Sequence, residues 1–141
     1  MAQHGTSVFA FEVARTTTRA RAMLAHWGQV GRSAARTAAW IDFGLIVAYS
    51  AFLLSLAKVL GRRARARNIA SATSLTAIAS GLAIAAGFAN VLAKVGQLVI
   101  LAPNTQQPYP ALAFSAALLN DALLAAAIIA CATLGILGFR R

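Results

Sequence analysis

A small group of strongly polar side chains stands inside long apolar stretches of this 141-residue chain. The group consists of Asp42, Asn90, Lys94, Asn120 and Asp121. A lone charge at the centre of a membrane-spanning helix costs about 2.5–3.5 kcal/mol on insertion scales, so such groups pair with one another or face a polar cavity. The sequence therefore predicts one intramembrane polar cluster. A carboxylate beside an ammonium can lock helix register, or it can relay a proton or cation.

The depth of these residues follows from the connectivity of the chain. Consecutive spans run antiparallel, so the loop at residues 102–110 marks one membrane surface, from which each helical residue adds about 1.5 Å. On this count Lys94 lies roughly 10 Å deep, Asp121 roughly 14–16 Å and Asp42 about 6 Å. We predict an ion pair or hydrogen bond between Lys94 and Asp121, with Asn90 and Asn120 satisfying the remaining donors and acceptors.

The sequence lacks the residues that a membrane haem, a metal cluster, a nucleophilic active site or a phosphate-binding loop requires. Both histidines, His4 and His26, precede the first apolar stretch, so no pair of axial ligands for a membrane haem exists. Cys131 is the single cysteine and its neighbours are Ala, Ile and Leu, which excludes a thiolate metal cluster and an activated nucleophile. No Gly-rich phosphate loop is present. We therefore expect no catalytic residue, no metal site and no cofactor, and we expect that the chain is not an enzyme.

Three apolar blocks must position the polar residues, at about residues 38–60, 69–101 and 111–138. Each is at least as long as the ~20 residues that a helix needs to cross a bilayer. Charged residues make up 11% of the chain, against about a quarter in soluble domains. Since only helices satisfy their own backbone in lipid, the sequence predicts an all-α, polytopic membrane protein whose three transmembrane helices occupy residues 37–141.

The middle block carries a stripe of small and polar residues at alternating spacings of three and four. The stripe consists of Thr73, Thr76, Ser80, Ala83 and Gly87, and it continues through Asn90, Lys94 and Gln97. In a bilayer such a face turns toward protein, which predicts a helix-packing seam and makes the middle span the one most surrounded by protein. A face that lines water or a substrate is the alternative.

Residues 1–36 form a basic amphipathic segment. Within it, residues 8–31 predict an N-terminal amphipathic interfacial helix, since apolar residues recur on one face and arginines on the other. The apolar face consists of Phe9, Val13, Ala20, Leu24 and Trp27. Gly28 and Gly31 then allow a turn into the first span. A flexible soluble tail is the alternative.

Arginine supplies most of the net charge of +10. We expect anionic lipid headgroups to contact Arg15, Arg19, Arg21, Arg62, Arg63, Arg65 and Arg67. Each basic residue near a membrane surface contributes about 1 kcal/mol to such anchoring. Nucleic acid is not an expected partner, because the stacking aromatics of a nucleic-acid interface do not accompany these arginines.

Orientation is ambiguous, because arginines flank the first span on both sides. With the region 62–67 and the C-terminal arginines in the cytoplasm, the uncharged loop 102–110 lies outside, and so does the N-terminus. We prefer this N-outside arrangement, since the opposite one places more basic residues outside. An upstream helix absent from this chain, or a partner that holds the N-terminal segment, would remove the conflict. The high Ala and Arg content suggests a bacterial source, and hence the inner (cytoplasmic) membrane.

Three short runs carry a resemblance. They are Phe11-Glu12-Val13-Ala14-Arg15, Trp27-Gly28, and Trp40-Ile41-Asp42-Phe43 before a span that contains Tyr49. In these runs the chain resembles uncharacterised small multi-helix integral membrane proteins of bacteria, which often have one more helix upstream. Of the acidic-Asn pair in the next span of those proteins, Asn90 is matched and Ala89 takes the acidic position. The resemblance implies no activity.

Two functions fit these features. The first is a non-catalytic accessory or structural subunit of a membrane protein complex, whose partners are other membrane subunits or further copies of the chain. The alternative is an oligomeric component that transports ions, protons or small solutes along the polar stripe and Asp121. Three helices are too few to enclose such a pathway, so transport requires several copies.

Overall fold

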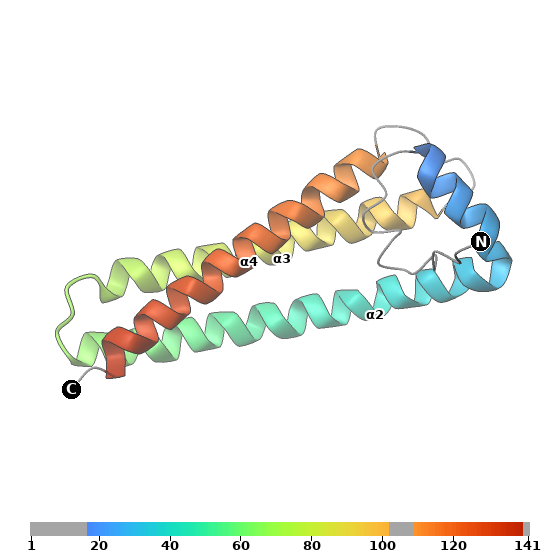
Figure 1. The fold of residues 1–141 in the computed structure, drawn as a ribbon. Helices are drawn as coiled ribbons and strands as arrows, with labels where there is room; N and C mark the ends of the chain where they lie inside the picture. Colours follow the sequence, from blue (N-terminus) through green and yellow to red (C-terminus); the bar gives the residue numbers. More distant parts are fainter. Residues whose placement is uncertain (1–16, 102–108, 140–141) are drawn as a thin grey trace, which may run out of the picture. The chain divides into compact units, whose positions relative to one another are not determined.

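The computed structural model describes residues 17–101 and 109–139, which form three helices (Figure 1). These are α2 (Thr17–Ala66), α3 (Ala72–Ile100) and α4 (Tyr109–Phe139). Each is long and apolar enough to cross a membrane, which confirms an all-helical chain with the composition of a multi-pass membrane protein. Much of the predicted interfacial helix of residues 8–31, including Phe9, Val13 and Arg15, lies outside the described residues.

Helix α2 is interrupted at Gly28 (Figure 1). Gly28 has φ 61° and ψ −161°, a combination that is readily adopted only without a Cβ atom. The predicted turn is therefore present at Gly28, but Gly31 lies within the resumed helix. There the Trp27 side chain covers Gly31 so closely that a Cβ atom on Gly31 would stand 2.6 Å from Trp27 Cβ.

Beyond the kink, α2 continues without interruption to Ala66, so it is longer at both ends than the predicted span 38–60. Its C-terminus is a Schellman motif with Asn68 in the left-handed conformation, at φ 57°. The Ile69 N–H donates to Ala64 O at 3.3 Å and the Asn68 N–H to Arg65 O at 2.9 Å. This cap satisfies two carbonyls that the end of the helix would leave open, and it turns the chain into α3.

The chain divides into two compact units, and every helix contributes residues to both. The first unit contains the described residues up to Gly44 and those from Asn90 to Leu118. In it Met23 and Leu24, which precede the kink, are buried with Ile100, Leu101 and Ala113, and Trp27 packs beside them. In this part of α2 the apolar face is therefore covered by protein.

The second unit contains residues from Leu45 to Ala89 and the described residues from Leu119 onward. Its core is built mainly from alanines. The buried residues are Ala57 and Ala64 of α2, Ala72 and Ala79 of α3, and Cys131 and Leu134 of α4. Small side chains let helix backbones approach closely, which in lipid replaces the hydrophobic effect as the source of helix association.

Gly61 and Gly87 mark the closest approaches between α2 and α3 in this unit. A Cβ atom on Gly61 would overlap Thr76 Oγ1, and one on Gly87 would stand 2.6 Å from Ser50 Oγ. A methyl group at Gly61 would displace the Thr76 side chain, and one at Gly87 would require the Ser50 hydroxyl to rotate away, so glycine lets the two helices pack as they do without either change.

Candidate functional site: polar residues of the spans and a groove between α2 and α4

In the first unit, Lys94 of α3 pairs with Asp42 of α2. Lys94 Nζ lies 2.7 Å from Asp42 Oδ2, and the exposed fractions of the two side chains are 10% and 33%. The pair neutralises both charges, which is how charged residues are tolerated inside membrane-spanning helices. Its short distance and the burial of Lys94 are typical of a lock between two helices.

The sequence predicts Asp121, rather than Asp42, as the partner of Lys94. Asp121 belongs to the second unit, so a Lys94–Asp121 pair stays a prediction. The depth count places Asp42 and Lys94 in the same leaflet, but it does not give the rotation of each helix about its axis. That rotation decides which carboxylate Lys94 meets, and in the structure it is Asp42.

In the second unit, three side chains form a hydrogen-bonded chain. The Tyr49 hydroxyl donates to Asn120 Oδ1 at 3.3 Å, and Asn120 Nδ2 donates to Asp121 Oδ1 at 3.1 Å. Asn120 is buried, whereas Asp121 is exposed at the surface of the chain. Tyr49 is absent from the residues selected from the sequence. The available signal was its place in the span that follows the run Trp40-Ile41-Asp42-Phe43, on which the resemblance drew.

The predicted stripe of α3 is partly buried. Thr73 is exposed, Thr76, Ser80 and Asn90 are half-buried, and Ala83, Gly87, Lys94 and Gln97 are buried. Thr76 Oγ1 donates to the Ala72 carbonyl at 2.6 Å, so its hydroxyl is satisfied within its own helix. In the most apolar 18-residue window of each helix, 28% of the residues are buried in α3, 22% in α4 and 17% in α2, a difference of one or two residues, so the greater enclosure of the middle span stays a prediction.

Where Gly87 meets α2, one buried hydroxyl lacks a partner. Ser50 Oγ is buried and, among the described residues, makes no hydrogen bond. It faces Gly87 and Ile46 Cγ2 lies nearby, so its surroundings are small and apolar. A buried hydroxyl without a partner costs free energy, so this contact contributes packing rather than polar stabilisation.

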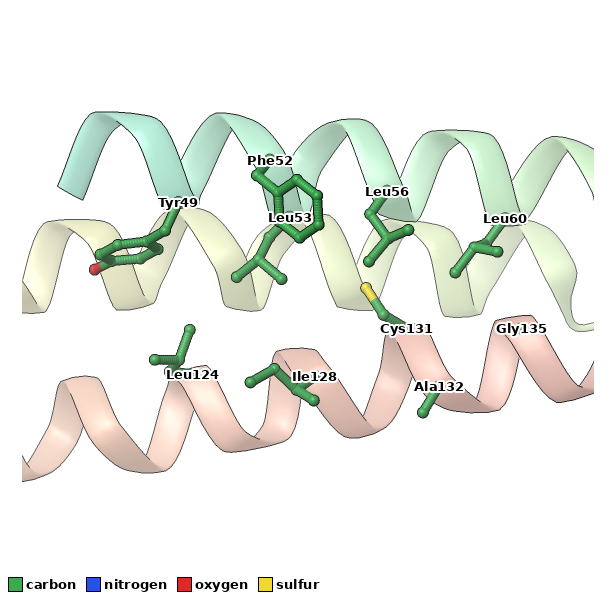
Figure 2. A pocket seen from close by; sticks show the side chains of 10 residues that line it. All are labelled: Tyr49, Phe52, Leu53, Leu56, Leu60, Leu124, Ile128, Cys131, Ala132 and Gly135. Carbon is green, nitrogen blue, oxygen red and sulfur yellow. The ribbon is translucent and has the colours of Figure 1, made fainter. Parts of the chain in front are cut away.

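An apolar groove of about 610 Å³ lies between α2 and α4 in the second unit (Figure 2). Tyr49 stands at one end, and Leu60 and Gly135 stand at the other. Leu56 and Leu60 of α2 point toward α4, and Cys131 Sγ of α4 points back toward Leu56 (Figure 2). Apart from Tyr49 and Cys131 the lining is aliphatic or aromatic, so the groove suits an apolar occupant.

A second hollow of about 560 Å³ lies at the C-terminal ends of the same two helices. It is lined by Arg63, Ala66, Arg67, Gly138 and Phe139. The Arg63 guanidinium carbon lies 5.0 Å from the centroid of the Phe139 ring, a cation–π contact that holds this side chain over the hollow.

The remaining arginines of the predicted headgroup set do not line this hollow. Arg62 and Arg65 are exposed on other faces of α2. Arg21 is exposed near the start of α2, Arg19 falls in the same helix, and Arg15 lies outside the described residues.

Within residues 17–101 and 109–139, no three His, Cys, Asp or Glu side chains come together as a metal site would require. Comparison of the chain with protein-family models, with curated proteins and with solved structures finds no match.

Proposed function

We propose that this chain is a non-catalytic subunit of a membrane protein assembly, and that the face of α4 around Asp121 contacts another subunit. The observation that carries the proposal is the exposure of Asp121 within a membrane-spanning helix. The partner is a further copy of the chain or a different membrane protein. Anionic lipid headgroups on the arginines anchor the chain, and nucleic acid has no part in it.

Asp121 is the only charged residue of α4. It lies roughly 18 Å along the helix from Tyr109 and roughly 27 Å from Phe139, at about 1.5 Å per residue, so neither end brings it close to water. Leu118 and Leu119 beside it are exposed as well. A charge without a counter-charge costs about 2.5–3.5 kcal/mol in a span, and the hydrogen bond from Asn120 does not neutralise the Asp121 carboxylate, whereas a cation on a neighbouring subunit would.

The Lys94–Asp42 pair supports the structural reading. Its ammonium and carboxylate already neutralise each other at 2.7 Å, which leaves this pair suited to hold α2 against α3. Such internal locks and small-residue seams are typical of subunits whose role is to assemble.

The test is purification in a mild detergent from the native membrane, followed by mass determination of the complex and identification of its components. Wild type should run at a mass above that of one chain, and Asp121→Leu should release single chains. Thr133→Leu is the matched control, since Thr133 is exposed on the same helix and its hydroxyl donates to the Ile129 carbonyl one turn earlier in α4. A wild type at the mass of one chain, or equal behaviour of both variants, would overturn the proposal.

The Tyr49–Asn120–Asp121 chain favours a second candidate, transport by several copies of the protein. Three linked polar groups in apolar helices offer a path for a proton. The Tyr49 hydroxyl and the Asn120 amide each donate and accept hydrogen bonds, and the Asp121 carboxyl can bind or release a proton. In liposomes, ion or proton flux that disappears in Asp121→Asn and falls in Tyr49→Phe supports transport. Absence of flux in wild type excludes it.

The proposed location is the inner membrane of a bacterium, with the N-terminus outside. The arginines at the end of α2 support this orientation, because basic residues near the end of a span stay in the cytoplasm. A reporter that is active only in the cytoplasm, fused after Arg141, should be active. An inactive reporter would reverse the orientation.

A further inference from the structure

We propose that the second unit binds one anionic phospholipid between α2 and α4, with an acyl chain in the apolar groove and the headgroup phosphate on Arg63 and Arg67. This inference is independent of the subunit role proposed above. The lipid would occupy one defined site, in contrast to lipids that a basic segment attracts diffusely at an anionic membrane surface.

The groove has the length of a lipid tail. From Tyr49 to Leu60 it follows eleven residues of α2, which is about 16 Å at 1.5 Å per residue. Half of a hydrocarbon core about 30 Å thick, the part that one leaflet occupies, is about 15 Å. Gly135 keeps the end of the groove open, because a Cβ atom there would meet only Leu60 Cδ1, at 3.9 Å.

The groove and the basic hollow lie on one continuous face of each helix. Leu60 and Arg63 are three residues apart on α2 and therefore lie on the same side of the helix, and Arg67, just after the end of α2, lines the hollow together with Arg63. On α4, Gly135 and Gly138 are three residues apart and continue the same side. The apolar lining therefore passes directly into the pair of arginines.

Close backbone contact forms the floor of the basic hollow. A Cβ atom on Gly138 would lie 3.6 Å from Arg63 Cβ and 3.7 Å from Ala64 N, so α4 reaches the α2 backbone there. The Phe139 ring lies beneath the Arg63 guanidinium. A second helix on this surface would bury both arginines, whereas a lipid phosphate complements them.

Arginine is suited to this ligand because its planar guanidinium donates two parallel hydrogen bonds to a phosphate. The acyl chain gains little by leaving the bilayer for an equally apolar groove. The headgroup contacts therefore carry most of the affinity, and the groove selects a ligand with a tail. Basic pockets between helices at the cytoplasmic end of a span have this character.

The headgroup test compares two double variants that each remove two positive charges from the six residues 62–67 at and just beyond the end of α2. In Arg63→Gln/Arg67→Gln the arginines of the hollow are lost, and in Arg62→Gln/Arg65→Gln those of other faces are lost. Phosphatidylglycerol and phosphatidylcholine are titrated separately onto the detergent-solubilised full chain, and bound lipid is counted by native mass spectrometry. We expect phosphatidylglycerol affinity to fall roughly 10- to 30-fold in the first variant and less than about threefold in the second.

Equal losses in the two variants would overturn the site in favour of diffuse attraction. Equal binding of phosphatidylcholine and phosphatidylglycerol by wild type would overturn it as well. Circular dichroism melting of each variant shows whether its helices are intact. If the first variant is misfolded, Arg63→Lys/Arg67→Lys takes its place: it keeps the charge without the planar guanidinium and should bind with intermediate affinity, and wild-type affinity would contradict the proposed phosphate geometry.

To test whether an acyl chain occupies the groove, a large side chain is introduced to fill it. Gly135→Phe should abolish phosphatidylglycerol binding, whereas Gly81→Phe adds the same side chain at an exposed position with open space around it and should leave binding unchanged. Glycerol phosphate, which has no tail, should fail to compete. Competition by glycerol phosphate together with normal binding in Gly135→Phe would identify a phosphate site without a lipid tail and overturn the proposal.

Discussion

The Lys94–Asp42 ion pair predicts that leaving the Lys94 charge without its partner destabilises the protein more than removing both charges. The Lys94 side chain is 10% exposed and that of Asp42 is 33% exposed. Asp42→Leu leaves the more buried charge unpaired, so we expect a loss of about 2.5 kcal/mol, near the lower end of the cost of a lone intramembrane charge. Lys94→Met leaves the Asp42 carboxylate alone, and the depth count places this group nearer the membrane surface than Lys94, so about 1.5 kcal/mol is expected.

The double variant Lys94→Met/Asp42→Leu contains no unpaired charge. Apolar residues of similar volume often replace a buried ion pair at little cost, so the double variant should lose no more than about 1.5 kcal/mol. The resulting coupling of about 2.5 kcal/mol lies within the range measured for residues in contact.

The assay is equilibrium unfolding of the four proteins in mixed micelles of a mild detergent and dodecyl sulfate, followed by circular dichroism. Lys58→Met is the control, because Lys58 is exposed on the same helix as Asp42 and should change stability by less than about 0.5 kcal/mol. A loss of stability in the double variant that equals the sum of the losses in the two single variants would refute the pairing. So would a Lys94→Met variant that behaves like Lys58→Met.

Two further predictions concern the seam between α2 and α3. Gly61→Ala should destabilise by about 1–3 kcal/mol because its methyl group would overlap Thr76, whereas Gly81→Ala, at an open position, should be neutral or stabilising by up to about 1 kcal/mol; equal effects in the same unfolding assay would contradict the close approach. Gly87→Ala should likewise destabilise, and Ser50→Ala should rescue it by removing the hydroxyl that the methyl group meets. Ser50→Ala alone should be nearly neutral, and a loss above about 1 kcal/mol would indicate that this hydroxyl is hydrogen-bonded.

The spans could be predicted because apolar runs of this length have few other uses, and the break at Gly28 because glycine tolerates its backbone angles. The two ends of α2 could not be predicted from hydropathy. Arginine is a good helix former, so the helix continues through Arg62 and Arg65 until Asn68 caps it. Hydropathy marks where a helix leaves lipid, and the cap determines where the helix ends.

Less of the candidate site could be predicted from the sequence. Depth counting places Asp42, Lys94 and Asp121 in one leaflet, but it contains no information about the rotation of each helix, which decides which carboxylate meets the ammonium. The alanines of the seam escape notice in a chain so rich in alanine. The groove between α2 and α4 depends on two faces that are distant in sequence, so no local pattern indicates it.

The seam of small residues between α2 and α3 also bears on the order of events during synthesis. Ala64 and Ala72 are separated by little more than the turn capped by Asn68, so this seam joins segments that leave the ribosome one after the other. Contacts that are local in sequence form fastest. The two helices can therefore enter the bilayer as a finished hairpin, and α4, which follows them, meets a surface that is already in place.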